Sequence, residues 1–183
     1  MSEIADRYRR VSGGFADVVR GVGDDGWAGV APCDGWTAKD VVDHVVGVHQ
    51  MYLSFAKDVL EAPDVSGLEP AQAFEALRGA VQRGLQDEAV AGYEFDGFFG
   101  RTRFDEAADG ILMADVLVHT WDLGKASGQS PTLDEEVAQR ALDRLHGMGD
   151  AVRSPGIFGP EVPAPDGADV ATRLLCFTGR DAR

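Results

Sequence analysis

The segment ILMADVLVHTWDLG, residues 111–124, decides how the fold of this sequence is interpreted. It is largely apolar, yet Asp115, His119 and Asp122 recur in it at spacings of four and three residues. Residues at these spacings lie on the same face of an α-helix. If the segment forms a core helix, two carboxylates and an imidazole point together at the element it packs against, and buried charges need a partner.

A divalent metal ion would satisfy all three side chains at once. Carboxylate oxygens and neutral imidazole nitrogens both bind zinc, nickel or iron, and the facing helices of a bundle can bring such side chains together. Simpler roles also fit the sequence, because Asp115 could accept hydrogen bonds from a neighbouring helix and Asp122 could pair with Lys125. A metal site would need a further ligand from another helix.

Apolar stripes with helical spacing extend over most of the remaining chain. The signals that start and stop helices flank these stripes, as two capping boxes, a first-turn proline and a terminal glycine. These signals are Thr37 with Asp40, Thr132 with Glu135, Pro70 and Gly128. The predicted helices cover about 4–22, 38–60, 70–85, 106–127 and 132–148.

The segments between and after these helices are irregular. The aromatic and glycine-rich stretch 90–105 predicts a loop with a short strand pair folded over one end of the bundle. Proline and glycine are frequent from 149 to 165, where 158–163 is expected to be extended, and 173–183 is apolar enough to dock back on the body. The sequence therefore predicts an all-α fold, a four-helix bundle with additional short C-terminal elements, as a single domain over 1–183.

Charge and composition limit the classes of partner. The 31 Asp and Glu residues outnumber the 17 Lys and Arg residues, for a formal net charge of -14, which disfavours nucleic acids and anionic membranes. No apolar run reaches the roughly 18 residues of a membrane span, and the N-terminus lacks the apolar core of a signal peptide. We therefore expect a cytoplasmic protein. Cys33 and Cys176 form no Cys-x-x-Cys motif, so reduced thiols are expected in place of a zinc ribbon or redox pair.

The four histidines differ in their prospects as ligands. His44 lies in a valine-rich helical face, where a core role and a ligand role both remain open. His49 follows five residues later, a rotation of roughly 140° in a helix, so the two cannot both face one centre. His146 falls near the end of the last predicted helix, where a protonated imidazole favours the helix dipole. His119 belongs to the core segment described above.

Other catalytic motifs are absent from the sequence. It has no Gly-x-Gly-x-x-Gly fingerprint, P-loop, Gly-x-Ser-x-Gly elbow or His-Glu-x-x-His motif. Cys33 lies close to a predicted helix start, where the dipole lowers the pKa of a thiol, but a structural cysteine is the better interpretation.

Four stretches of the chain carry a family resemblance. They are residues 36–47 (WTAKDVVDHVVG), 114–128 (ADVLVHTWDLGKASG), 158–162 (FGPEV) and 173–181 (RLLCFTGRD). In combination they resemble the actinobacterial branch of the DinB-like superfamily, and more narrowly metal-binding proteins related to the N-terminal domain of mycothiol-dependent maleylpyruvate isomerase.

This resemblance implies a four-helix bundle with a divalent metal, zinc first and nickel as the alternative. The ligands it implies are a His of the second helix and an acidic residue and His four apart in a later helix, which fall on His44, Asp115 and His119. The resemblance therefore selects His44 over His49. In the isomerase-type motif Glu stands where this chain has Asp115, whose side chain is one methylene shorter, and the isomerase has a second domain where this chain has a short tail.

Three hypotheses follow for the function. In the first, the chain is a metal-dependent thiol S-transferase or isomerase, in which the metal deprotonates a low-molecular-weight thiol such as mycothiol for attack on an electrophile. Asp122 would then orient His119 or a bound water. In the second, the bundle binds a metal or small ligand without turnover, and a site sealed by 93–104 would favour it. In the third, the polar residues are purely structural. The sequence leaves open whether two chains form a homodimer.

Overall fold

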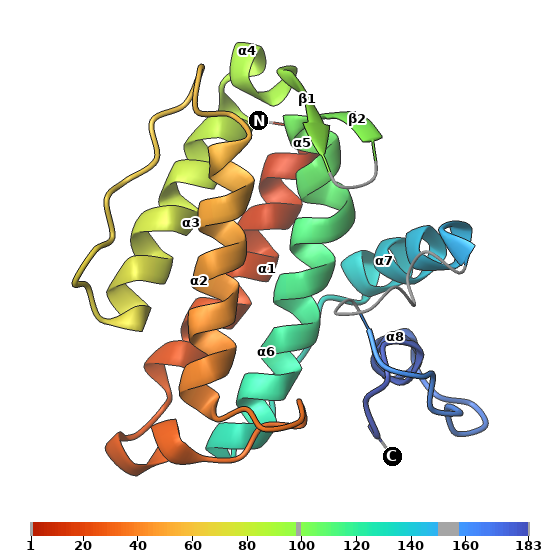
Figure 1. Ribbon diagram of the computed structural model, residues 1–183. Coiled ribbons are helices and arrows are strands. Elements are labelled where there is room, and N and C mark those ends of the chain that lie inside the picture. The colour runs from red at the N-terminus through yellow and green to blue at the C-terminus, as the bar shows by residue number, and fades with distance from the viewer. Residues whose placement is uncertain (1, 98–99, 150–157, 183) are drawn as a thin grey trace.

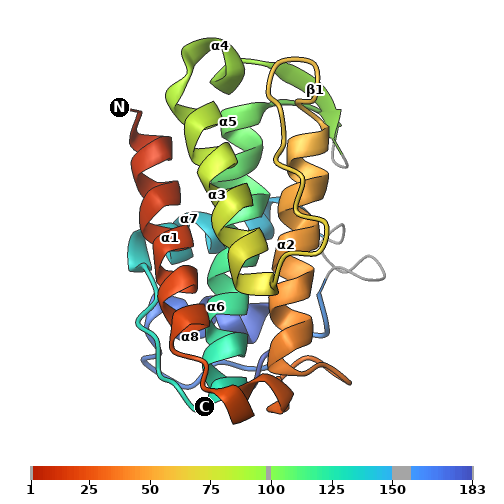
Figure 2. The same ribbon diagram turned by 90° about the vertical axis from the view of Figure 1, so that its left-hand side faces the viewer.

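Four long helices form the centre of the molecule in the computed structural model, which describes residues 2–97, 100–149 and 158–182. They are α1 (Glu3–Arg20), α2 (Ala38–Ser54), α3 (Pro70–Gln86) and α6 (Met113–Ser127). Helices α1 and α2 each contact both α3 and α6, so the four enclose a common core (Figures 1 and 2). The predicted all-α four-helix bundle is confirmed.

The chain path through the bundle includes one long crossover. After α1 the short 3-10 helix η1 (Asp24–Ala28) leads into α2 at one end of the bundle. Residues 55–69 then run back along the bundle, so that α3 starts near the same end as α2 and runs parallel to it (Figure 1). Helix α6 runs antiparallel to α2 (Figure 1), and the site described below joins side chains of these two helices.

The predicted apolar stripes form the core. Tyr8 and Phe15 of α1 are fully buried, as are Phe74 and Leu77 of α3. The rings of Phe15 and Phe74 meet edge to face with centroids 4.8 Å apart. Burial of these stripes is the main term that stabilises the bundle, because removing apolar surface from water contributes about 25 cal/mol per Å².

Helices α2 and α7 (Glu135–Gly147) each differ from the prediction at one boundary. Helix α2 begins as expected, because Thr37 and Asp40 form the capping box, but it ends at Ser54 and not near Leu60. Helix α7 begins three residues later than expected. Its cap is Asp134, whose carboxylate accepts a hydrogen bond from the Val137 backbone N–H. The predicted capping box at Thr132 is therefore wrong: a competing Asp lies closer to the first free backbone N–H groups.

The expected strand pair covers one end of the bundle. After the short helix α4 (Glu88–Ala91), β1 (Glu94–Gly97) pairs antiparallel with β2 (Gly100–Arg103). Glu94 lies opposite Arg103 and Gly97 opposite Gly100, which confirms the predicted short strand pair. The aromatic residues at 98 and 99 of this stretch lie outside the described residues.

The predicted helix over 106–127 is longer than expected and contains a wide turn. It begins with α5 (Phe104–Ala107), continues through the π-helical turn η2 (Ala108–Leu112) and becomes α6. A π-turn inserts an extra residue into the helix, and such turns often occur at functional sites. The helix ends as predicted at Gly128, which adopts the left-handed conformation with φ +73°.

The C-terminal part packs beside the bundle (Figure 1). Helix α8 (Val170–Phe177) contacts α7 and buries Leu174 and Leu175, so the predicted docking of the chain end is confirmed. The helix itself was not predicted, although Asp169 caps it by accepting from the Thr172 backbone N–H. Residues 158–165 have no regular secondary structure, as expected of an extended segment, and the predicted proline- and glycine-rich stretch at 150–157 lies outside the described residues.

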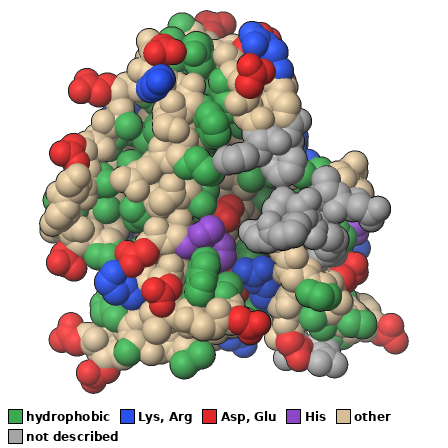
Figure 3. All heavy atoms as spheres, in the orientation of Figure 1, with side chains coloured by type: hydrophobic (Ala, Val, Ile, Leu, Met, Phe, Trp, Pro, Cys, Tyr) green, Lys and Arg blue, Asp and Glu red, His purple; other side chains and the backbone are tan. Residues whose placement is uncertain are grey.

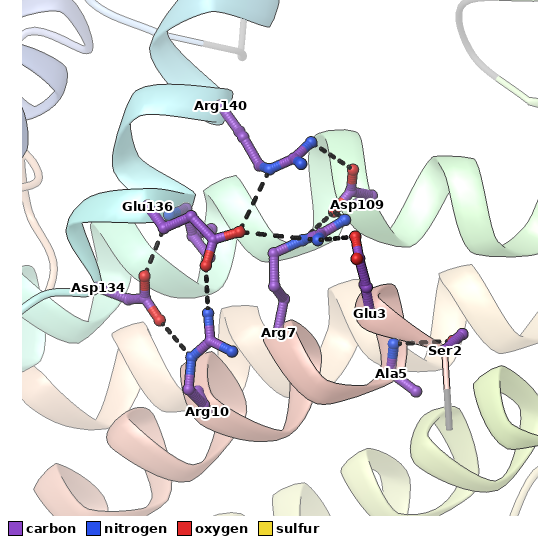
Figure 4. Close-up of polar contacts among 10 residues, drawn as sticks. Ser2, Glu3, Ala5, Arg7, Arg10, Asp109, Asp134, Glu136 and Arg140 are labelled. Carbon is purple, nitrogen blue, oxygen red and sulfur yellow. Dashed lines mark hydrogen bonds and ion pairs between the residues drawn. The ribbon is translucent and has the colours of Figure 1, made fainter.

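A cluster of ion pairs joins α7 to the bundle (Figure 4). Arg7 of α1 is only 5% exposed, and its guanidinium lies 2.8 Å from Asp109 in the π-turn. Arg10, one turn along α1, contacts Asp134 and Glu136 of α7, each at 2.8 Å. Acidic and basic groups alternate in this cluster, so that its charges are paired within the protein.

No helix in the described ranges is both long and apolar enough to span a bilayer.

Candidate metal centre

Three of the predicted site residues meet between α2 and α6. Asp115 Oδ1 lies 3.2 Å from His44 Nε2 and 3.5 Å from His119 Nε2. The two imidazole rings are edge to face, with centroids 4.6 Å apart. His119 is buried, whereas the side chain of His44 is 34% exposed, so the group lies at the edge of the core and not at its centre.

The loop before α2 holds Trp36 against the two histidines. An isolated β-bridge joins Val30 to Thr37, and the Ala31 backbone N–H donates to the Trp36 carbonyl at 2.9 Å. This small hairpin-like loop ends at the capping box of α2. It places the indole ring of Trp36 with its centroid 5.0 Å from the His44 ring and 5.8 Å from the His119 ring. The ring therefore forms one wall of the site.

The donor atoms suit a divalent metal ion. Ligands about 2.0–2.2 Å from a tetrahedral zinc ion lie about 3.3–3.6 Å from one another, close to the 3.2 and 3.5 Å between Asp115 Oδ1 and the imidazole nitrogens. The second carboxylate oxygen, Asp115 Oδ2, is buried without a hydrogen-bond partner among the described residues. An unpaired buried carboxylate oxygen is expensive, and a cation would satisfy it. The shorter side chain of Asp115 therefore still reaches both histidines.

The charges of the group are strongly coupled. Burial raises the pKa of Asp115, but the neighbouring imidazoles, His119 foremost, overcome this effect and hold the pKa of the carboxyl well below its ordinary value. Burial lowers the pKa of His119, but Asp115 and then Asp122 raise it well above its ordinary value. Asp115 is thus present as the carboxylate, the form that binds metals.

Asp122 stands behind His119, on the side away from Asp115. Its Oδ2 lies 2.9 Å from His119 Nδ1, a contact within ion-pair distance that is not aligned as a hydrogen bond. The expected alternative, an ion pair with Lys125, is wrong: Asp122 is fully buried and binds Arg180, while Lys125 lies over the Trp121 ring. A carboxylate behind a metal-binding imidazole is the usual arrangement that fixes its tautomer.

His49 and His146 lie apart from this group. His49 is fully buried; its Nε2 lies 2.9 Å from the Tyr8 hydroxyl and its Nδ1 lies 2.8 Å from the Val45 carbonyl. The prediction that only one of His44 and His49 faces the centre is thus confirmed. His146 is exposed in the last turn of α7, where its ring meets Phe177.

Comparison with known families identifies the family to which the helical bundle belongs. Residues 8–124, which include all three candidate ligands and Asp122, match the family described as the mycothiol maleylpyruvate isomerase N-terminal domain. The chain belongs to this family. The family is part of the DinB-like superfamily, so the resemblance stated from the sequence is confirmed.

Two proteins similar to this chain have nearly the same length. They are uncharacterised protein Rv0738 of Mycobacterium tuberculosis strain ATCC 25618 / H37Rv and uncharacterised protein MT0763 of strain CDC 1551 / Oshkosh. Each is 31% identical over 181 residues, which cover 96% of this chain and 97% of the relative. No solved structure matches the chain.

Sequence reasoning missed Arg180 as a residue of the site and favoured a purely structural role for Cys33. Arg180, from the C-terminal part beyond the matched family domain, donates to both carboxylate oxygens of Asp122, at 3.3 and 2.8 Å. Its Nη2 also lies 3.4 Å from Cys33 Sγ. Cys33, His119 and Asp122 are close enough together to hold a metal ion, but the guanidinium already supplies the positive charge there. No local pattern could indicate this contact, because 147 residues separate Cys33 from Arg180.

A cavity of about 520 Å³ adjoins the group of candidate ligands. Asp115 and His119 form part of its wall, together with Trp36 and Cys33 of the loop before α2 and Arg180 of the C-terminal part. In the space-filling view, histidine atoms reach the surface near the middle of the face, beside acidic and hydrophobic side chains (Figure 3). The family domain and the C-terminal part thus form this cavity together.

Proposed function

We propose that this chain binds one divalent metal ion through His44, Asp115 and His119 and uses it to activate a low-molecular-weight thiol of the mycothiol type. The reaction would be a transfer of that thiol to an electrophile or a thiol-dependent isomerisation. Zinc is the first candidate and nickel the second, because a site of two imidazoles and one carboxylate suits both ions. Membership of the mycothiol maleylpyruvate isomerase N-terminal domain family supports the class of reaction.

The observation that carries the proposal is the buried oxygen of Asp115. A purely structural hydrogen-bond network would satisfy both carboxylate oxygens, yet Oδ2 has no partner in the described part of the chain while Oδ1 is shared by two imidazoles. A cation among the three side chains removes this imbalance. A divalent ion that displaces the proton of His119 is a partner that suits a carboxylate and two imidazoles together.

A bound divalent ion would supply Lewis acidity, which lowers the pKa of a thiol so that the thiolate is present at neutral pH. The chain's own residues prepare the site for this chemistry. The negative charge of Asp122, 2.9 Å from His119 Nδ1, favours a proton on that nitrogen, which would leave Nε2 as the ligand. Arg180 holds Asp122 in place, and the Trp36 ring shields one side of the histidines from water.

The open cavity favours a reaction over mere metal storage. A site that needs only three protein ligands leaves coordination positions for other molecules, and the cavity of about 520 Å³ reaches Asp115 and His119. No described residue of the aromatic segment 93–104, whose closure over the site would favour a non-catalytic bundle, belongs to the wall of this cavity. A thiol could therefore approach the candidate ligands from solvent.

Cobalt substitution tests the proposal directly. The protein loaded with Co²⁺ is titrated with mycothiol, and a sulfur-to-cobalt charge-transfer band is expected to rise to one thiol per metal. The zinc protein is then given mycothiol and 1-chloro-2,4-dinitrobenzene, in which the thiolate sulfur replaces chloride and chloride leaves. Metal-dependent release of chloride above the uncatalysed rate is expected, with His119→Ala as the inactive control.

Two results would contradict parts of this account. A cobalt spectrum that mycothiol leaves unchanged would remove the thiol chemistry and favour a metal-binding bundle without turnover. Failure to bind any divalent ion would exclude both the thiol chemistry and the metal-binding bundle. The polar residues would then form a structural network only.

A further inference from the structure

A second cavity lies between α2, the β1–β2 hairpin and the π-turn. This hairpin cavity has a volume of about 250 Å³, and its wall includes Val48, Met51, Phe55, Phe95, Ile111 and Arg144. Val48 follows His44 by one turn of α2, and Ile111 precedes Asp115 by one turn of the π/α6 helix. Four residues of helix span about 6 Å, so the hairpin cavity begins one turn away from the candidate ligands.

The wall of the hairpin cavity is mostly apolar and aromatic. The rings of Phe55 and Phe95 are stacked, with centroids 4.8 Å apart and planes within 9°. Met51 is 38% exposed, one of the few large apolar side chains in the described part of the chain with that much exposure. An apolar cavity of about 150 Å³ can hold a benzene molecule. A cavity of about 250 Å³ therefore has room for a phenyl ring and a short chain.

One cation of the wall is available to a ligand. Arg101 is already paired with Glu94, at 3.0 Å, whereas Arg144 forms no ion pair with any residue in the described ranges. The Arg144 side chain lies over Gly110 of the π-turn: a methyl group added at Gly110 would lie 2.4 Å from its Nε and 2.6 Å from its Cζ. The missing side chain of Gly110 thus makes room for the guanidinium at the wall of the cavity.

We infer that the hairpin cavity binds the electrophilic substrate of the proposed reaction, an apolar and preferably aromatic molecule with one carboxylate. The apolar body of the substrate lies against Phe55 and Ile111, and its carboxylate contacts Arg144. A guanidinium suits this role because it binds carboxylates through two parallel hydrogen bonds. This inference rests on the proposed function. The thiol would enter through the cavity of about 520 Å³ beside Arg180. The two substrates would therefore reach the candidate ligands from two separate cavities.

Binding of unreactive probes tests the inference without turnover. The probes are 4-phenylbutanoate, 4-phenylbutanamide and 4-phenylbutan-1-amine, each titrated calorimetrically into the metal-loaded protein. The acid is expected to bind about five- to tenfold more tightly than the amide, the range for a charged hydrogen bond at a partly exposed site. Preference for the amine would assign the polar role to Glu106, which also lines the cavity, and would overturn the inference.

Four variants locate the binding. Arg144→Gln is expected to abolish the preference for the acid, and Gly110→Ala to reduce it by displacing the guanidinium. Ile111→Trp fills the cavity and should abolish binding of acid and amide alike. Arg101→Gln is the matched control, because that guanidinium is held by Glu94, and it should keep the preference.

The outcomes separate this inference from the proposed function. Equal binding of acid and amide, or binding that Arg144→Gln and Ile111→Trp leave unchanged, would overturn the inference even in an active enzyme. Conversely, the expected probe pattern in a protein that neither binds mycothiol nor transfers it would overturn the proposed function. The cavity would then be a site for apolar acids without that chemistry.

Discussion

His44 and His49 lie five residues apart on helix α2, yet the protein treats them in opposite ways. His49 is fully buried, and both of its ring nitrogens have a partner, the Tyr8 hydroxyl and the Val45 carbonyl. His44 is partly exposed and shares one oxygen of Asp115 with His119, while the other oxygen of Asp115 has no partner in the described chain. Helix α2 therefore contributes to two polar groups. One is a closed pair, His49 with Tyr8, and the other is an open cluster, His44 with Asp115 and His119.

The difference between them distinguishes a candidate ligand site from a structural histidine. Buried polar groups are normally satisfied within the protein, and His49 follows this rule. The cluster around Asp115 departs from this rule, because Asp115 Oδ2 has no donor among the described residues. The cluster also adjoins a cavity open to solvent. Such an excess of acceptors beside an opening is what a cation needs.

Removal of Asp115 should have the largest effect on the open cluster. Asp115→Ala is expected to lower zinc affinity more than about 100-fold, since loss of a partner behind a ligand already lowers it about 10- to 100-fold. Competition with a chromophoric chelator measures this affinity. Asp115→Glu, which introduces the carboxylate of the isomerase-type motif, is the control and should retain the metal. Unchanged affinity in Asp115→Ala would exclude this carboxylate as a ligand.

Removal of His49 should break the closed pair instead. His49→Ala leaves a cavity beside Phe74 and deprives the buried Tyr8 hydroxyl of its partner. The expected loss in the free energy of unfolding is about 3 kcal/mol, measured by urea denaturation of the metal-free protein. The metal content of the folded variant should equal that of the parent. A His49→Ala protein that is stable but has lost its metal would reverse the roles of the two histidines.

The same pair predicts a pH dependence of stability. Burial lowers the pKa of His49 from its ordinary 6.5 to about 4. Between these values the unfolded chain binds the proton and the folded chain does not, so the free energy of unfolding falls as the pH falls. This contribution is complete above pH 6.5 and diminishes by roughly 3 kcal/mol on acidification to pH 4.

Comparison with His49→Gln isolates that contribution from those of the other ionisable groups. Urea unfolding of the metal-free parent and of the variant from pH 7 to pH 4 should show a shallower decline in the variant. Parallel stability curves would mean that His49 does not remain neutral inside the folded protein.

The smallest expected effect concerns the support behind the open cluster. Asp122→Asn removes the negative charge next to His119 Nδ1 and should lower zinc affinity about 10- to 100-fold. Arg180→Gln leaves the contact of Asp122 with His119 in place and should lower it less. Chelator competition on both variants shows which of them loses more zinc affinity. A larger loss in Arg180→Gln than in Asp122→Asn would contradict the assignment of Asp122 as the group that orients His119.

Local patterns in the sequence predicted much of this arrangement. The spacing of Asp115, His119 and Asp122 placed them on one helical face, and the rotation between His44 and His49 correctly implied that only one could join them. The choice of His44 came from the family resemblance. The two geometric predictions succeeded because helical periodicity is a local property that the chain expresses within a few turns, whereas the role of His44 as a ligand stays a prediction.

Contacts between distant segments were beyond such reasoning. Arg180 meets Asp122 from 58 residues away, and Arg144 meets Gly110 through the packing of α7 against the π-turn. The π-turn has no distinct spacing signal in a helical pattern, and it lies within the predicted helix. The wrong cap at Thr132 arose because two potential caps stand two residues apart, and the backbone geometry favours Asp134.

The most direct test of the account is the metal content of three proteins prepared without a histidine tag or chelator. They are the parent, His44→Ala and His49→Gln, measured by elemental mass spectrometry after loading with zinc and gel filtration. The account predicts about one zinc per chain in the parent and in His49→Gln and almost none in folded His44→Ala. Equal metal in the two variants, or no metal in the parent, would contradict the division of α2 into a structural histidine and a metal ligand.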